Sequence, residues 1–171
     1  MFVKNKHNEI IAEVIDNYLP EGIPNELETT FLGRDVLWSF QQRVTNNQQT
    51  TNDCFFAFII WRQPEGIVSQ WFEQLVPIVE KLNYKALLRI KANMYPSTEK
   101  LHEHDPHEDY TFNNKSAIYY VNSNNGFTVL EDGSKIESVK NRLLIFDGSR
   151  QHYSTNCTDA QVRVTLNFNF L

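Results

Sequence analysis

The sequence lacks long hydrophobic runs and clusters of basic residues. Its longest apolar stretch, residues 54–61, is far too short to cross a bilayer, which takes roughly 20 apolar residues. Lysine and arginine are scattered along the chain, and the formal net charge is −5. Binding to nucleic acid or to an anionic membrane needs a basic patch, so we expect neither partner.

Cysteine is scarce as well. Cys54 lies in the apolar stretch and Cys157 in a polar one, and their positions do not suggest a disulfide framework. Free thiols are typical of a reducing compartment. Residues 1–7 contain no hydrophobic segment of the kind found in a secretory signal. We therefore expect a cytoplasmic protein.

Aromatic residues and short strand patterns are abundant. The 12 Phe, 7 Tyr and 3 Trp among 171 residues favour a β-rich core in a single domain, residues 1–171. Helices are predicted near 20–32 and over 68–82, where Pro77 implies a kink and the helix should lie outside a sheet. Strands are predicted over 11–15, 36–40, 54–61, 84–95, 117–121, 127–130, 135–139, 142–146 and 161–170. This order, with helices only in the N-terminal half, indicates a mainly β (α+β) sandwich or barrel of antiparallel strands.

Two dipeptides predict turns between these strands. Asn125-Gly126 stands between the apolar strands 117–121 and 127–130, and Asn-Gly is a strong hairpin signal because both residues tolerate positive φ. We therefore expect those two strands to pair. Asp132-Gly133 marks the next turn.

The strands 84–95 and 161–170 each carry one apolar and one polar face. In the last strand the polar face consists of Arg163, Thr165, Asn167 and Asn169. Such a face usually points to solvent. A barrel with a polar interior that holds a polar ligand is the alternative, and it would place the Arg163 guanidinium where it can bind a carboxylate through two hydrogen bonds.

A histidine-rich segment, residues 101–109, follows the first of these strands. It contains His107-x-Asp109, and residues i and i+2 of an extended segment point to the same side. His152, after the strand 142–146, is the best third ligand. Two histidines and one carboxylate that leave open coordination positions are typical of non-haem Fe(II) oxygenases.

The segment allows other interpretations. It could be an acidic surface loop with solvated histidines, because one His-x-Asp pattern arises readily by chance. His102, His104 and Asp105 could in principle supply ligands instead, but neither of these histidines has an acidic residue two positions later. We therefore prefer His107 and Asp109.

In combination these residues resemble the prolyl-hydroxylase-like Fe(II)/2-oxoglutarate-dependent oxygenases. Tyr95-Pro96, His107-x-Asp109, the run Ile118-Tyr119-Tyr120-Val121-Asn122, His152 and Arg163 appear in that family's order. The resemblance covers about half of the chain, residues 84–171. It implies a double-stranded β-helix (jelly-roll) core with N-terminal helices packed on the major sheet.

The resemblance also implies roles for single residues. His107, Asp109 and His152 would bind Fe(II). Arg163 would pair with the far carboxylate of the cosubstrate 2-oxoglutarate, Tyr120 would donate a hydrogen bond to that carboxylate, and Tyr95 would flank the cosubstrate.

The implied reaction is hydroxylation of a C–H bond with O2, with succinate and CO2 as co-products. A prolyl residue in a peptide or protein is the favoured substrate, and a small molecule remains open. The polar segment 41–53 stands where prolyl hydroxylases carry a mobile substrate-covering loop, although such segments are usually plain surface connections.

Three rival functions remain. Related oxygenases that act on alkylated nucleic acid usually have a second arginine six residues after the first, and Asn169 occupies that position here. A cupin-like metal-binding barrel would carry out other chemistry without 2-oxoglutarate. A non-catalytic binding module would leave the histidines without a role.

Overall fold

The computed structural model describes residues 1–44 and 53–171. Two helices lie in the N-terminal half, α1 (Ile23–Phe31) and α2 (Phe72–Val79). The strands are β1 (Phe2–Lys4), β2 (Ile10–Ile15), β3 (Ser39–Gln41), β4 (Phe55–Arg62), β5 (Gly66–Ile67), β6 (Leu87–Pro96), β7 (Lys115–Tyr120), β8 (Phe127–Leu130), β9 (Lys135–Glu137), β10 (Arg142–Asp147), β11 (His152–Ser154) and β12 (Val162–Phe170). β1, β5 and β11 have no counterpart in the predicted strands. No helix in this part of the chain is both long and apolar enough to span a membrane.

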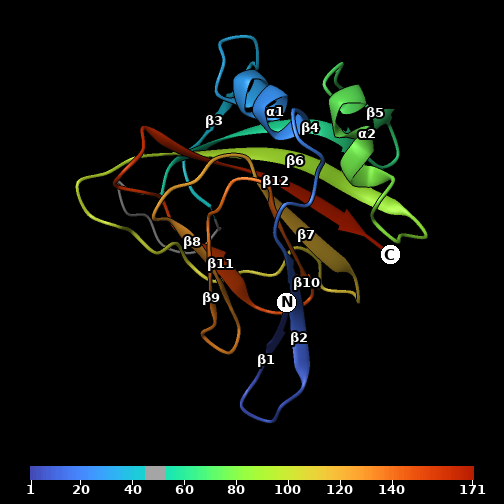
Figure 1. Ribbon diagram of the computed structural model, residues 1–171, viewed down its shortest axis with the longest axis vertical. Helices are drawn as coiled ribbons and strands as arrows, with labels where there is room; N and C mark the ends of the chain where they lie inside the picture. Colours follow the sequence, from blue (N-terminus) through green and yellow to red (C-terminus); the bar gives the residue numbers. More distant parts are fainter. Residues whose placement is uncertain (45–52) are drawn as a thin grey trace.

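The described strands form two antiparallel sheets. The larger has nine strands in the order β1-β2-β10-β7-β12-β6-β4-β3, with β5 paired to β4, and the smaller has the order β11-β8-β9. Both helices lie on one side of the large sheet, and the small sheet lies on the other side (Figure 1). This arrangement agrees with the predicted mainly β jelly-roll architecture.

Apolar residues of both helices and the large sheet share one core cluster. Leu27 and Phe31 of α1 and Leu75 and Ile78 of α2 are at most 1% exposed and belong to the same cluster as Ile90 of β6. Because this face of the sheet is covered, its opposite face is left to line the space toward the small sheet.

The α2 helix is shorter than the predicted 68–82. Pro77 lies within it, and the helix ends two residues later at Val79. Proline has no N–H for the helical hydrogen bond to the residue four positions earlier, so it weakens the helix at this point. At the start, the Ser69 hydroxyl accepts a hydrogen bond of 3.2 Å from the Trp71 N–H.

The polar faces of β6 and β12 lie side by side. The two strands pair with Arg163 opposite Tyr95 and Asn167 opposite Lys91, and these residues face away from the helices into a cavity. The polar faces of these two strands therefore point into the interior of the protein and not to solvent. In the sequence, Leu87 alternates in phase with the polar residues Arg89 and Lys91. It nevertheless belongs to the apolar core, because the register shifts between Asn169 and Phe170.

The predicted hairpin at Asn125-Gly126 is wrong. β7 pairs with β10 and β12 in the large sheet, whereas β8 pairs with β9 and β11 in the small sheet. The chain crosses between sheets here, and a Cβ added to Gly126 would collide with the Asn156 carbonyl oxygen and the Arg163 side chain. Glycine at this position thus lets the Asn156 carbonyl oxygen and the Arg163 side chain lie close to the backbone, and it does not form a hairpin turn. The turn at Gly133, with φ of +87°, does connect the paired strands β8 and β9.

Candidate metal centre

His107 and His152 are joined through their backbones. The His107 N–H donates to the His152 carbonyl oxygen at 2.9 Å, and the His152 N–H donates to the His107 carbonyl oxygen at 3.0 Å. The preceding His104 N–H donates to the Ser154 carbonyl oxygen at 2.9 Å, so the histidine segment runs antiparallel to β11. Two residues that exchange both hydrogen bonds lie directly opposite each other, and their side chains therefore emerge as neighbours. The two ring centroids are 4.6 Å apart.

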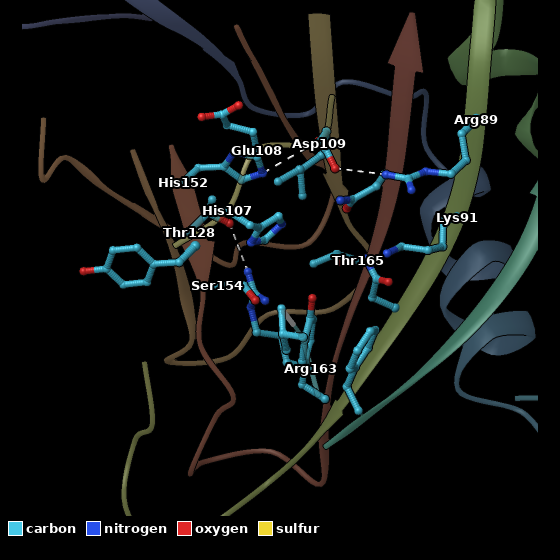
Figure 2. A pocket seen from close by; sticks show the side chains of 17 residues that line it. Arg89, Lys91, His107, Glu108, Asp109, Thr128, His152, Ser154, Arg163 and Thr165 are labelled. Carbon is cyan, nitrogen blue, oxygen red and sulfur yellow. Dashed lines mark hydrogen bonds and ion pairs between the residues drawn. The ribbon is translucent and has the colours of Figure 1, made fainter. Parts of the chain in front are cut away.

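Asp109 is held beside this pair by its backbone and by glycine. Its N–H donates to the Gly148 carbonyl oxygen at 3.0 Å. A Cβ at Gly148 would collide with the Ser116 hydroxyl, so the glycine leaves room for Ser116 to reach Asp109. The His152 Nε2 lies 3.7 Å from Asp109 Oδ2 (Figure 2).

The Asp109 carboxylate accepts hydrogen bonds from three side chains. Arg89 Nη2 donates to Oδ1 at 2.9 Å, while Ser116 Oγ at 2.6 Å and Asn169 Nδ2 at 2.9 Å donate to Oδ2. Burial acts to raise the pKa of Asp109, but the charges of His152 and Arg89 outweigh this effect and hold the pKa below its ordinary value. The carboxylate is therefore ionised and fixed in place.

His107, Asp109 and His152 have the geometry of a ligand set. One ligand atom from each lies within 4.8 Å of the others. Within residues 1–44 and 53–171, Nδ1 of His107 and Nε2 of His152 are buried without a hydrogen-bond partner. The 3.0 Å contact of His152 Nδ1 with the Arg150 carbonyl oxygen requires the proton on Nδ1, which leaves a lone pair on Nε2.

Burial, and then the neighbouring His152, lowers the pKa of His107 to about 4. A histidine must be neutral to bind a metal, so at neutral pH His107 is in its ligand form. Arg163 lies at the other end of the same cavity, which has a volume of about 160 Å³.

Arg163 is completely buried and faces inward. Its guanidinium donates to Ser138 Oγ at 2.7 Å, to the Thr155 carbonyl oxygen at 3.2 Å and to Thr128 Oγ1 at 3.1 Å. Figure 2 shows the contact with Thr128, which lies between Arg163 and the histidines. A buried cation thus stands at one end of the cavity and the three potential metal ligands at the other.

The two tyrosines with roles implied by the resemblance differ in position. Tyr95 lines the cavity, and the centre of the Arg163 guanidinium lies 5.4 Å from its ring centroid. Tyr120 is fully buried behind the lining and donates a hydrogen bond of 2.9 Å to Thr128 Oγ1. Thr128, rather than Tyr120, therefore lines the cavity, and its hydroxyl accepts a hydrogen bond from Arg163.

Comparison with solved structures finds the same fold in oxygenases. A prolyl hydroxylase from Trichoplax adhaerens, in complex with a peptide of hypoxia inducible factor, is 16% identical, with 94% of this chain and 83% of that chain covered and a TM-score of 0.66. A prolyl-4-hydroxylase from Pseudomonas putida is 15% identical, with 94% and 91% covered and a TM-score of 0.61. HygX from Streptomyces hygroscopicus, with nickel and 2-oxoglutarate bound, is 11% identical, with 93% and 82% covered and a TM-score of 0.59.

The fold is that of prolyl hydroxylases and other Fe(II)/2-oxoglutarate oxygenases. The resemblance inferred from the sequence is thereby confirmed at the level of the fold. Comparison of the sequence with protein-family models and with curated proteins finds no match.

The other two histidines of the segment 101–109 lie apart from the candidate ligands of this oxygenase fold. His102 Nε2 lies 2.7 Å from Asp53 Oδ1. His104 is 3% exposed, its Nδ1 lies 3.0 Å from Ser154 Oγ, and its ring stacks on Tyr95 at 5.1 Å. His104 therefore supports the cavity wall from behind through Tyr95 and Ser154.

Several residues of the site received no supporting role from the sequence. Arg89 and Asn169, which hold Asp109, lie on the polar faces of the two alternating strands, and that alternation was the available signal. Ser116 and Thr128 are single hydroxyls in apolar strands and gave no signal. The predicted substrate-covering segment, 41–53, includes residues 45–52, which lie outside the described residues.

Proposed function

We propose that this chain is an Fe(II)- and 2-oxoglutarate-dependent dioxygenase that hydroxylates a C–H bond and releases succinate and CO2, with residues 1–171 as a single catalytic domain. The observation that carries the proposal is the convergence of His107, Asp109 and His152 in a cavity whose other end holds the buried cation Arg163. The shared fold supports the same assignment.

The candidate ligands fit Fe(II). Two imidazole nitrogens and one carboxylate oxygen on one side of an ion leave positions for a cosubstrate and O2, as in non-haem iron oxygenases. The unpartnered nitrogens of His107 and His152 are the kind of buried polar atoms that a bound ion satisfies. Once bound, Fe(II) and 2-oxoglutarate together supply the activation of O2 and the oxidation of the C–H bond.

The chain itself binds, orients and shields the reactants. Arg163 has five N–H donors, of which contacts with the described residues use three, so it retains donors for a carboxylate of 2-oxoglutarate. Thr128 is placed to share that carboxylate, and Tyr120 orients the Thr128 hydroxyl from behind. Tyr95 flanks the cosubstrate and, with the aromatic ring of Phe55 stacked on it at 5.5 Å, excludes water from one side.

We propose a prolyl residue in a peptide or protein as the substrate. The prolyl hydroxylases that share the fold, one of them in complex with a peptide, support this choice. HygX, which has been solved with hygromycin B bound, makes a small molecule the alternative. A cytoplasmic location stays a prediction.

Turnover of 2-oxoglutarate tests the proposed function. Purified protein with Fe(II), 2-oxoglutarate and O2 should form succinate faster when a panel of proline-containing peptides and amino acids is added, and mass spectrometry should show the gain of one oxygen atom in the substrate. His107→Ala or Asp109→Ala should abolish succinate formation. Wild-type turnover in either variant would refute the ligand assignment, and a cupin-like barrel or a binding module would form no succinate at all.

A further inference from the structure

Lys91 is a cation of the cavity to which the proposed chemistry gives no role. It projects from β6 into the cavity that His107 also lines (Figure 2). Along β6 it lies between Arg89 and Tyr95, and Tyr95 pairs with Arg163 of β12. Its ammonium lies 5.6 Å from the ring centroid of Phe55. Burial, and then the charge of Arg89, lowers the pKa of Lys91 to about 8, so the group is still mainly protonated at neutral pH.

No carboxylate forms an ion pair with Lys91 within residues 1–44 and 53–171, although the charge of Asp109 acts on Lys91 at longer range and favours its protonated form. The two acidic residues that line the cavity are Glu108 and Asp109. Glu108 is exposed and accepts a hydrogen bond of 3.1 Å from Gln151, and Asp109 pairs with Arg89 instead. A half-buried cation without an ion-pair partner is unfavourable, and a methionine of similar length would fill the same space without that cost. Such a charge indicates a ligand.

With a metal ion and 2-oxoglutarate bound, the positive charge of Lys91 would still have no counter-charge of its own in the cavity. A bound metal dication and 2-oxoglutarate would together carry no net charge. Asp109 alone would then balance the three cations Arg163, Arg89 and Lys91, and a positive charge would be in excess. The loaded cavity therefore favours a further anion.

Two side-chain amides beside Lys91 indicate that the ligand carries a hydrogen-bond donor next to its negative charge. Asn93 and Asn167 line the cavity next to it, and Asn93 is 2% exposed. The Oδ1 atoms of both amides are buried without a hydrogen-bond donor from the part of the chain that the structure describes. A group that brings a negative charge together with an N–H or O–H donor would satisfy all three side chains. One ammonium with neutral amides suits a singly charged carboxylate, whereas phosphate is bound best by arginine forks.

We propose that Lys91 binds a carboxylate of the primary substrate, which is a free carboxylic acid with an adjacent N–H or O–H donor or the free C-terminus of a peptide. This inference rests on the proposed function and narrows its substrate class. A peptidyl proline qualifies only when such a carboxylate accompanies it.

Binding to protein loaded with Zn(II) tests the proposal without turnover. Calorimetric titrations with saturating 2-oxoglutarate would use three pairs: L-proline and L-prolinamide, L-lactate and lactamide, and Gly-Gly-Pro and its C-terminal amide. We expect at least one acid to bind roughly 10- to 100-fold more tightly than its amide, the range that corresponds to hydrogen bonds to a charged group. Which pair responds distinguishes a free acid from a peptide C-terminus.

Lys91→Met should remove this preference and leave the affinity for 2-oxoglutarate unchanged, which also shows that the variant is folded. Lys85→Met is the matched control, because Lys85 is exposed and lies outside the cavity. The proposal is overturned if no acid binds, if acids and amides bind alike, or if Lys91→Met weakens 2-oxoglutarate binding itself, which would assign Lys91 to the cosubstrate. Absence of 2-oxoglutarate binding to the wild type would instead refute the proposed function, while the acid series with Zn(II) alone would still report on Lys91.

Discussion

Asp109 is the residue on which the site depends most. Three side-chain donors fix its carboxylate, and one of them, Ser116, lies on a neighbouring strand and donates the shortest of the three hydrogen bonds. Side chains that orient a metal ligand in this way typically contribute 10- to 100-fold to metal affinity. The geometry of the carboxylate is thus set by residues outside the proposed ligand set.

Ser116→Ala should therefore weaken binding of Zn(II) or Fe(II) by roughly 10-fold or more. The matched control is Ser149→Ala, because Ser149 also donates to an aspartate, Asp147, at 2.6 Å but that aspartate lies outside the metal centre. Competition with a chelating dye measures both affinities. Equal affinities in the two variants would show that Ser116 does not orient Asp109.

His104 makes the stability of the metal-free protein depend on pH. Burial, and then the charge of His102, lowers the pKa of His104 to about 3, whereas the unfolded chain has an ordinary histidine pKa near 6.5. Below pH 6.5 the unfolded state then binds more protons than the folded state. Stability should consequently be greatest above pH 6.5 and fall as the pH drops, by up to about 1.4 kcal/mol per pH unit from this group.

Denaturant unfolding of the metal-free protein between pH 7 and pH 5 measures this effect. His104→Phe, which keeps a ring against Tyr95, should reduce the slope without removing it, because the pKa of His107 is lowered as well, and His7→Phe on an exposed turn should leave the slope unchanged. A wild-type slope in His104→Phe would contradict the assignment of His104 as a buried neutral histidine.

The sequence indicated the candidate ligands and Arg163 better than it indicated the residues that hold these side chains in place. Strict alternation in 161–170 placed Arg163 on the polar face of the strand, which the structure turns toward the cavity. The two-residue spacing of His107 and Asp109 predicted that both lie on one side of their segment, and their ligand atoms do converge. Arg89 and Ser116 were missed because a supporting role depends on a contact between strands far apart in the sequence. No local pattern encodes such a contact.

At the scale of elements, the wrong prediction with the largest consequence was the hairpin between β7 and β8, where the chain instead crosses from one sheet to the other. The Asn-Gly signal describes local backbone preference, but the strand partners are decided by the sheet into which each strand packs. Gly126 is needed there because Arg163 and the Asn156 carbonyl oxygen occupy the space of a side chain. The turn that looked like a hairpin is part of the wall around Arg163.

Gly126→Ala should therefore displace Arg163 and weaken 2-oxoglutarate binding by roughly 10-fold, the loss of about one hydrogen bond to a charged group, while metal affinity stays within about two-fold. Gly133→Ala is the control. Gly133 has a positive φ, so this change should lower the free energy of unfolding by about 1 kcal/mol, but open space surrounds Gly133. The affinity of the folded protein for 2-oxoglutarate, measured by calorimetry with Zn(II) present, separates the two variants. An unchanged affinity in Gly126→Ala would mean that Arg163 does not bind the cosubstrate.

At the scale of the whole molecule, one face of the large sheet is covered by helices, and the other faces the small sheet (Figure 1). This division explains the alternation of β6 and β12, with apolar residues toward the helices and polar residues toward the cavity. The class and the order of the elements were accessible from the sequence because strand spacing and alternation are local. The partition of strands between two sheets was not, since it depends on contacts across the molecule.

An anaerobic titration with Fe(II) and 2-oxoglutarate tests the central claim most directly. The account predicts a weak visible charge-transfer band that appears only when both are present, that is absent in His107→Ala, and that requires far more 2-oxoglutarate in Arg163→Met although metal affinity is retained. A wild-type protein that binds Fe(II) but develops no band at any concentration of 2-oxoglutarate would contradict it.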